Sequence, residues 1–197
     1  MMDVPVFYAT TEGQTRRVAE CLASVLRERG LDSRAIALTS PEADDVNLEA
    51  TRAVILAASV HGGEHQPVAR AFARRHAAVL SARPSIFVSI SLSIHSARDG
   101  EVAKARRIAH AFPAGAGWTP ITVACVAGRL AYTQYGFLKR WVMRRIARQN
   151  GGPTDTSRDY EYTDWNAVRG LGDDLARRVL PAPRPEPVPV LVAAAGR

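Results

Sequence analysis

The fold is decided by the stretch FYATTEGQT, residues 7–15, which follows a short apolar run and leads into a helical pattern. The run that contains its start, VPVFYA at residues 4–9, is rich in β-formers and has the length of one strand. After it, apolar residues recur at i, i+4, i+7 and i+8 from Val18, which is one face of a helix. Three threonines, a glycine and a glutamine therefore lie where a strand turns into a helix, and they have the polar groups to hold a ligand.

The rest of the chain alternates predicted strands and helices. Three of the strands are nearly all apolar, as a parallel sheet covered on both faces requires. The pattern predicts an α/β fold with an open, doubly wound, five-stranded parallel sheet, in which ligands bind at the carboxyl ends of the strands. Strands are expected at residues 4–9, 32–38, 53–58, 85–91 and 121–128, and helices at 15–30 (with Gly30 as C-cap), 67–80 (with Pro67 in the first turn), 99–112 and 164–180 (with Thr163 or Asp164 as N-cap).

The composition is that of a globular protein, with 47% hydrophobic and 23% charged residues in 197. We expect a single domain over residues 1–180, with an insertion at about 129–163. The tail, residues 181–197, has five prolines in its first nine positions and is expected to be extended or disordered.

The sequence also predicts where the protein works. No apolar run approaches 18 residues, so no membrane-spanning helix is expected, and the N-terminus lacks the pattern of a secretion signal. Cys21 and Cys125 have no motif spacing, and we interpret both as buried thiols in a reducing compartment. We therefore expect a cytoplasmic protein.

The net charge of +7 is concentrated in one segment. Residues 129–149 hold six basic residues and no acidic one, so removing these six charges leaves +1 on the rest of the chain. A specific anionic partner for this segment is therefore expected. The six are Arg129, Lys139, Arg140, Arg144, Arg145 and Arg148.

The loop at residues 10–15 has the features of a phosphate site. It lies at the carboxyl end of the first strand and at a helix N-terminus, where free N–H groups and the helix dipole favour an anion. Its threonines add hydroxyl donors, and Gly13 allows close backbone approach. It lacks the lysine of a P-loop and the G-x-G-x-x-G of a dinucleotide site, so neutral donors would hold the phosphate. The alternative is that the threonines only cap the helix.

Two further loops are expected at the same crevice. ASVHGGEHQP, residues 58–67, contains a Gly-Gly pair that lets backbone groups face a flat ligand, and residues 89–100 are rich in serine. His61 and His65 are four apart, but no carboxylate or thiol pattern completes a metal site. His61 could be a polar neighbour of a bound ring or an ordinary solvated histidine. No G-x-S-x-G serine or loop cysteine supports a covalent nucleophile, and no side chain is assigned as catalytic. The three loops fit a mononucleotide with a planar ring.

These motifs resemble a known family. ATTEGQT is similar to the FMN-phosphate loop of flavodoxins, and the chain more closely resembles the flavodoxin-like, quinone-dependent protoporphyrinogen IX oxidases of bacteria. The specific part is the stretch at residues 127–165, in which AG-x-L-x-Y-x-x-Y, a basic amphipathic run, GG-x-TDT and YTDW follow in the family's order. PSIFVSISL, residues 84–92, also matches, and the resemblance covers roughly residues 4–180.

The resemblance implies a flavodoxin-like fold with a basic helical insertion after the fifth strand, and FMN as cofactor. It implies that the protein removes hydrogen from protoporphyrinogen IX in haem biosynthesis and passes electrons to a membrane quinone. The implied phosphate contacts are Thr10, Thr11, Glu12 (through its backbone), Gly13, Gln14 and Thr15, and the implied ring contacts are Ser59, Val60, His61, Gly62 and Gly63, with Ser91, Leu92 and Ser93 on the other side.

Two departures from the family pattern bear on ring binding. An Arg-Tyr pair is usual in the second loop, where this chain has His61 and Gly62. Arginine and tyrosine are also usual near the start of the insertion, where this chain has Ala131 and Thr133. The chain therefore lacks an aromatic ring and a cation beside the expected flavin.

The sequence leaves several interpretations of the basic insertion open. Its helix could pack on the domain with its arginines in water, or it could meet an anionic membrane surface at the inner face of the cell membrane, with Trp141 at the interface. The propionates of a porphyrinogen are also anions. Nucleic acid is disfavoured because no aromatic platform accompanies the charge. The candidate membrane or substrate contacts are Lys139, Arg140, Trp141, Arg144, Arg145 and Arg148.

Two other functions remain open from sequence. The chain could be a flavodoxin-like FMN electron carrier that docks to a protein partner, although a charge of +7 differs from the acidic surfaces usual for flavodoxins. It could also have lost the flavin and serve in binding. A homo-oligomer is compatible with the sequence, which does not fix the oligomeric state.

Overall fold

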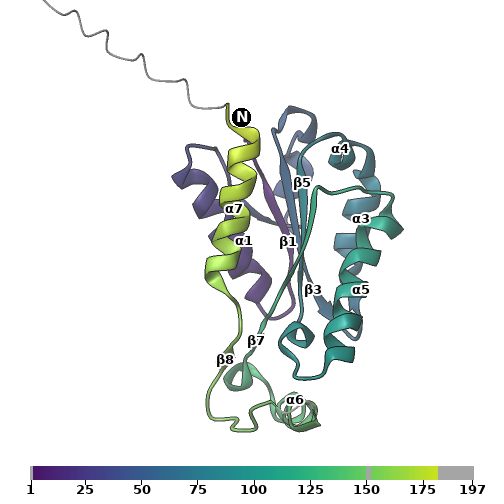
Figure 1. The fold of residues 1–197 in the computed structure, drawn as a ribbon, viewed down its shortest axis with the longest axis vertical. Helices are drawn as coiled ribbons and strands as arrows, with labels where there is room; N and C mark the ends of the chain where they lie inside the picture. Colours follow the sequence, from purple (N-terminus) through teal and green to yellow (C-terminus); the bar gives the residue numbers. More distant parts are fainter. Residues whose placement is uncertain (1, 150–151, 182–197) are drawn as a thin grey trace, which may run out of the picture.

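The structure is a computed structural model that describes residues 2–149 and 152–181, apart from the side chains of Lys139, Ile146 and Gln149. Its centre is a parallel sheet with the strand order β2-β1-β3-β5-β6 (Figure 1). The order reverses at β1, which pairs with β2 on one side and β3 on the other. The strands are β1 (Val6–Ala9), β2 (Ala35–Ala37), β3 (Val54–His61), β5 (Ser85–Ile90) and β6 (Thr122–Val126). The predicted doubly wound five-stranded sheet is confirmed.

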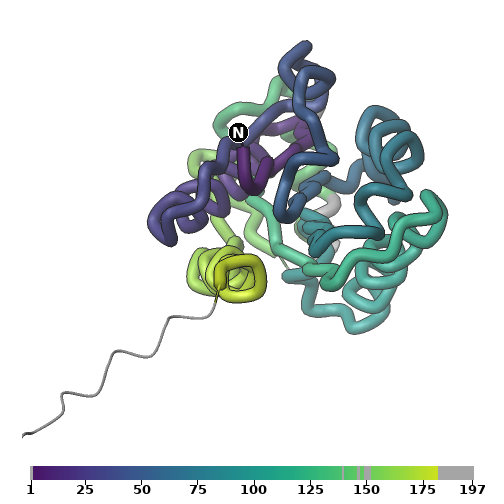
Figure 2. The backbone as a smooth tube through the Cα atoms, turned by 90° about the horizontal axis from the view of Figure 1, so that it is seen from above, coloured from purple at the N-terminus to yellow at the C-terminus, as the bar shows by residue number. Residues whose placement is uncertain are grey.

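Helices cover both faces of the sheet (Figures 1 and 2). One face packs on α1 (Gln14–Glu28) and α7 (Trp165–Val179), through a core that includes Leu22 and Leu175. The other packs on α3 (Pro67–Arg75), α4 (Ala77–Ala82) and α5 (Asp99–Ala116), through a core that includes Phe87 and Phe112. Since β3 and β5 lie between both cores, their side chains are buried on both sides, which explains their apolar sequences.

Four short elements lie in the connections. They are α2 (Glu42–Asp45), η1 (Leu48–Ala50), β4 (Glu64–His65) and η2 (Leu92–His95). β4 pairs antiparallel with the end of β3, so that residues 60–65 form a hairpin. Gly62 and Gly63, with φ of 60° and 89°, form its two-residue turn, which requires positive φ at both positions.

The insertion forms a separate small lobe at the carboxyl edge of the sheet (Figure 1). It comprises β7 (Arg129–Leu130), η3 (Tyr132–Gln134), α6 (Phe137–Gln149) and β8 (Tyr160–Glu161). β7 and β8 form an antiparallel pair, and Leu130, Tyr132, Tyr135 and Ala147 build a third apolar cluster beneath α6. The insertion therefore has its own core beside the place where the sheet presents its loops.

Most predicted elements are present, with shifted boundaries. Asp164 caps α7 by accepting a hydrogen bond from Ala167 N at 3.0 Å, as expected. The helix expected at residues 67–80 is interrupted at His76, and the helix expected to end at residue 112 continues through Pro113 to Ala116. The proline-rich tail lies outside the described residues, except for Pro181.

The two cysteines are free, but they are half-buried rather than buried as expected. Among the described residues, no helix combines the length and the apolar character needed to cross a bilayer.

Candidate functional site

A cavity of about 510 Å³ opens at the carboxyl ends of β1, β3 and β5. This is the edge at which doubly wound folds bind ligands, and the volume is in the range of small-molecule sites. The cavity also borders α5 and the insertion. It is lined by Thr10, Glu12, Gln14, Thr15, Ser59, Val60, His61, Gly62, Gly63, Ile90, Ser91, Leu92, Ser93, Glu101, Lys104, Ala105, Ile108, Gly128, Arg129 and Met143.

The structure brings the three predicted loops together at this cavity. Of the fourteen residues expected at the cofactor, only Thr11 and Gly13 are absent from its lining. Gly13 nevertheless shapes the loop: its φ of 83° lies in the left-handed region, and its N–H donates to Thr10 Oγ1 at 2.9 Å. Helix α1 then begins at Gln14.

The N-terminus of α1 is suited to an anion. Its N-cap residue is Gly13, which has no side chain to cap the first N–H groups of the helix, and among the described residues the Thr10 hydroxyl bonds only to the N–H of Gly13 itself. Thr15 is fully buried, and its Oγ1 has no hydrogen-bond partner although it lines the cavity. A buried hydroxyl without a partner costs free energy, and a phosphate oxygen would supply the missing partner.

The side chain of Gln14 is hydrogen-bonded within the protein. Its Nε2 donates to Glu161 Oε1 and to Thr163 Oγ1, both at 2.7 Å, and its Oε1 accepts from Arg17 Nη1 at 3.1 Å. The side chain thus holds the start of α1 against the strand β8 and the residues that follow it. Its proposed contact with a phosphate can involve only the backbone N–H.

The second loop is fixed by Gln66, which sequence reasoning missed. Its Nε2 donates to Ser59 Oγ at 2.5 Å and lies 3.3 Å from Thr11 Oγ1, so one amide joins the first two loops. Its Oε1 is buried without a hydrogen-bond partner. No local pattern marks Gln66, because both contacts depend on how the hairpin folds back.

The two histidines of the hairpin lie in different environments. His61 is exposed at the cavity, whereas His65 is buried between Phe87 and Phe112, with its Nε2 2.9 Å from Ser89 Oγ. Burial, with a smaller contribution from the charge of Arg70, lowers the pKa of His65 to about 4. His65 is therefore a neutral core residue that supports the hairpin.

The third loop is tightened by its own serines. Ser91 N donates to Val126 O at 3.0 Å, and Ser91 Oγ accepts from Ser93 N at 3.2 Å. Gly128, just after β6, packs against the end of β5: a Cβ at this position would lie 3.5 Å from Ile90 Cγ2. The third loop and the start of the insertion therefore form one wall of the cavity.

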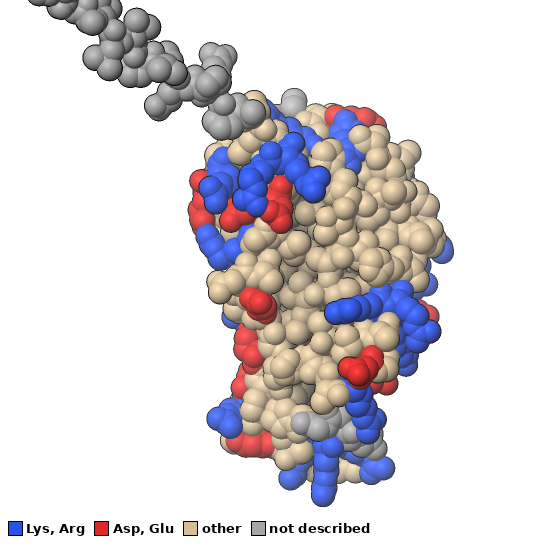
Figure 3. All heavy atoms as spheres, in the orientation of Figure 1, with Lys and Arg blue, Asp and Glu red and all other residues tan. Residues whose placement is uncertain are grey.

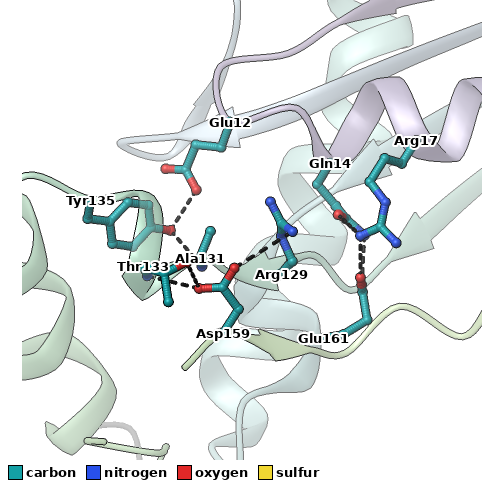
Figure 4. Close-up of polar contacts among 9 residues, drawn as sticks. All are labelled: Glu12, Gln14, Arg17, Arg129, Ala131, Thr133, Tyr135, Asp159 and Glu161. Carbon is teal, nitrogen blue, oxygen red and sulfur yellow. Dashed lines mark hydrogen bonds and ion pairs between the residues drawn. The ribbon is translucent and has the colours of Figure 1, made fainter. Parts of the chain in front are cut away.

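The insertion is hydrogen-bonded directly to the loop at residues 10–15, the candidate phosphate loop (Figure 4). Tyr135 Oη donates to Glu12 Oε2 at 2.6 Å and accepts from Ala131 N at 3.3 Å. Burial, and then the hydrogen bond to Glu12, raises the pKa of Tyr135. Glu161 accepts from Arg17 Nη1 at 2.6 Å, which adds a second link to α1.

Comparison with known proteins defines the family. The family model described as "Flavodoxin domain" matches residues 5–157 of this chain. The chain belongs to the flavodoxin-domain family. The resemblance expected from the loop sequences is thereby confirmed, and it applies to the domain that carries the cavity.

Two relatives of this flavodoxin-domain protein carry the same name in distant organisms. The protoporphyrinogen IX dehydrogenase [quinone] of Escherichia coli strain K12 is 29% identical over 175 residues, which are 89% of this chain and 95% of the relative. The protein of that name in Leishmania major is 30% identical over 178 residues, which are 90% of this chain and 76% of the relative. Both alignments extend over the fold and the insertion.

Solved flavodoxins share the fold. Oxidised flavodoxin 1 of Bacillus cereus superposes with a TM-score of 0.56 at 16% identity, over 90% of this chain and 99% of that one. Flavodoxin 2 of the same organism gives 0.56 at 14% identity, over 89% and 99%. At these identities the likeness concerns the fold alone.

Proposed function

We propose that this protein is an FMN-dependent oxidoreductase that oxidises protoporphyrinogen IX and passes the electrons to a quinone, as the names of its relatives state for them. The observation that carries the proposal is the buried, unpartnered Thr15 hydroxyl at an uncapped helix N-terminus, inside the cavity of a flavodoxin-domain chain. This site fits a phosphate-bearing flavin better than a free phosphate, because the cavity continues from Thr15 to the loops that follow β3 and β5.

The residues present fit FMN. The N–H groups of the loop at residues 10–15 and the hydroxyls of Thr10 and Thr15 would hold the phosphate. The Gly62–Gly63 turn on one side, and Ser91, Leu92 and Ser93 on the other, would hold the planar ring. When bound, FMN supplies the two-electron redox chemistry. The chain's own residues would bind and orient it, and the insertion would shield it from water.

The second loop offers little stacking to a ring. Its tip is Gly62–Gly63 and its one ring-bearing neighbour at the cavity is His61. An open tip leaves one face of the flavin accessible to a large, flat tetrapyrrole. This supports an enzyme whose substrate stacks on the exposed flavin ring. In an electron carrier, we would expect an aromatic side chain of the protein to cover that ring.

We also propose that helix α6 contacts an anionic membrane surface, where a quinone would be met. Phe137 and Leu138 are 87% and 72% exposed, and Trp141 is 55% exposed, which is costly for a face that meets only water. Arg144, Arg145 and Arg148 on the same helix are also exposed. Figure 3 shows Lys and Arg side chains gathered at this end of the molecule.

The two remaining basic residues expected at this surface are Arg140 and Lys139. The guanidinium of Arg140 donates to Tyr132 O at 3.0 Å and to Tyr135 O at 2.9 Å, so it holds α6 against the segment that precedes it and is less available to a lipid. The side chain of Lys139 lies outside the described residues. At about 1 kcal/mol for each basic residue near an anionic surface, the three exposed arginines would give reversible attachment.

An assay of the purified protein tests the function. With FMN bound, we expect protoporphyrinogen IX to be oxidised faster than in air alone when a menaquinone analogue is present, with matching reduction of the quinone. A yellow protein with no rate above autoxidation would exclude the enzyme and leave the electron carrier. A protein that purifies colourless and takes up no FMN would exclude both.

A further inference from the structure

Arg129 is directed toward the phosphate loop, although it belongs to the insertion. In the β7–β8 pair it lies directly opposite Glu161, and directly opposed residues of antiparallel strands project from the same face. Glu161 is bonded to Gln14 and Arg17 in the first turn of α1. Arg129 therefore extends to the same end of the cavity, among the residues drawn in Figure 4.

The guanidinium of Arg129 is only partly satisfied by the chain, through an ion pair with Asp159. Its side chain is only 19% exposed, and its Nε is buried without a hydrogen-bond partner. Its Nη1 lies 3.8 Å from Asp159 Oδ2, which is longer than a hydrogen bond. The other oxygen of Asp159 already accepts from Thr133 N and Thr133 Oγ1, at 2.9 and 2.8 Å. A largely buried cation with unused donors is costly unless an anion completes it.

The other charges around the cavity do not complete it. Glu12 is engaged by Tyr135, and Glu101 and Lys104 come from α5. Among the described residues that line the cavity, Thr15 and Arg129 each have one buried polar atom without a hydrogen-bond partner, Oγ1 and Nε, and they come from segments far apart in the sequence. One phosphate between them would supply an acceptor to each.

We propose that Arg129 binds the phosphate of FMN, so that the phosphate site has a cation supplied by the insertion. The proposal rests on FMN being the cofactor, as proposed above. It replaces the expectation from sequence that neutral donors alone hold the phosphate. Charge-assisted bonds from a guanidinium are strong and directional, so Arg129 would select FMN over riboflavin and would make cofactor retention depend on the folded insertion.

The test is a titration of the full-length, flavin-free protein with FMN and, separately, with riboflavin, which lacks the phosphate. We expect Arg129→Gln to weaken FMN binding by about 10- to 100-fold and to change riboflavin binding by less than about 2-fold. Arg129→Lys should recover part of the loss. The matched control is Arg158→Gln, which removes a side chain of the same insertion that is 70% exposed and should leave both affinities unchanged. Relative to wild type, the ³¹P resonance of bound FMN should shift in Arg129→Gln and should not shift in Arg158→Gln.

Three results would overturn the proposal. Equal loss of FMN and riboflavin would mean that Arg129 supports the fold or the ring. Unchanged FMN affinity with a raised KM for protoporphyrinogen would mean that the cation meets a propionate of the substrate. If the wild-type protein binds FMN no more tightly than riboflavin, and Thr15→Val changes neither affinity, the proposed phosphate site does not exist. Only this last result would also contradict the proposed function.

Discussion

The hydroxyl of Tyr135 donates a 2.6 Å hydrogen bond to the Glu12 carboxylate, which joins the insertion to the phosphate loop. Tyr135 is 4% exposed and Glu12 is half-buried, so this bond is partly shielded from water. The two residues are 123 positions apart in the chain. The loop that would hold FMN and the lobe that carries α6 are therefore mechanically coupled, and each stabilises the other.

Replacing Tyr135 with Phe tests this coupling. Because the bond to a charged acceptor would be lost, we expect the free energy of unfolding to fall by about 1–3 kcal/mol and FMN to bind several-fold more weakly. Chemical denaturation and FMN titration measure the two effects. Tyr160→Phe is the control, since among the described residues Tyr160 Oη is hydrogen-bonded to the exposed Arg158 side chain alone. Loss of stability without any loss of FMN affinity would contradict the coupling.

Gly13 and Gly30 provide a matched pair for the phosphate loop. Both have φ of 83°, and a Cβ at either would meet nothing within 4 Å, so Ala at either adds the same backbone strain of about 1–2 kcal/mol. Only Gly13 belongs to the proposed phosphate loop. We expect Gly13→Ala to lose bound flavin and Gly30→Ala to keep it at similar stability, as read from absorption spectra and melting curves. Equal flavin content in both variants would place the phosphate elsewhere.

The buried His65 predicts a loss of stability in acid. Its pKa is about 4 in the folded protein, against about 6.5 when exposed, so the folded state disfavours the proton. The stability from neutral His65 is complete above about pH 6.5 and is lost as the pH falls toward 4, by about 3 kcal/mol in total.

Denaturation curves between pH 7 and pH 4 measure this effect. We expect His65→Gln to show a shallower dependence on pH than wild type, even if it is less stable at pH 7. His61→Gln, at the exposed end of the same hairpin, should keep the wild-type slope. Identical slopes for all three proteins would show that His65 does not carry the acid sensitivity.

The exposed face of α6 can be tested with vesicles. We expect Phe137→Ser combined with Trp141→Ser to reduce cosedimentation with anionic phosphatidylglycerol vesicles by 10-fold or more, since both apolar anchors are removed. Ile121→Ser is the control, because Ile121 is 44% exposed but lies directly before β6, outside the insertion. Binding of the wild type should also weaken as salt rises. Equal binding to neutral and anionic vesicles would contradict a role for the arginines.

Local patterns predicted most of the fold. The apolar runs of β3 and β5, the helical face that begins at Val18, and the Asp164 cap are set by residues close in sequence, and the structure contains all of them. The extension of β3 to His61 was missed because the Gly62–Gly63 turn was interpreted as a loop rather than as a hairpin.

The site was only partly predictable. The loop at residues 10–15 is continuous in sequence, and its strand-to-helix context marked it as part of the cavity that the structure contains. The roles of Gln66, Tyr135 and Arg129 depend on contacts between distant segments, for which a single sequence carries no periodic or spacing signal. Arg129 was counted only as part of the basic segment at residues 129–149, although it lies on β7 and not on the helix that carries the exposed arginines.

A crystal structure of the protein with FMN tests the central claim most directly. The account predicts the phosphate at the start of α1, with Thr15 Oγ1 and the N–H groups of residues 11–15 within hydrogen-bond distance, and the ring between the Gly62–Gly63 turn and Ser91–Ser93. A flavin bound elsewhere, or a phosphate that leaves Thr15 Oγ1 without a partner, would contradict it.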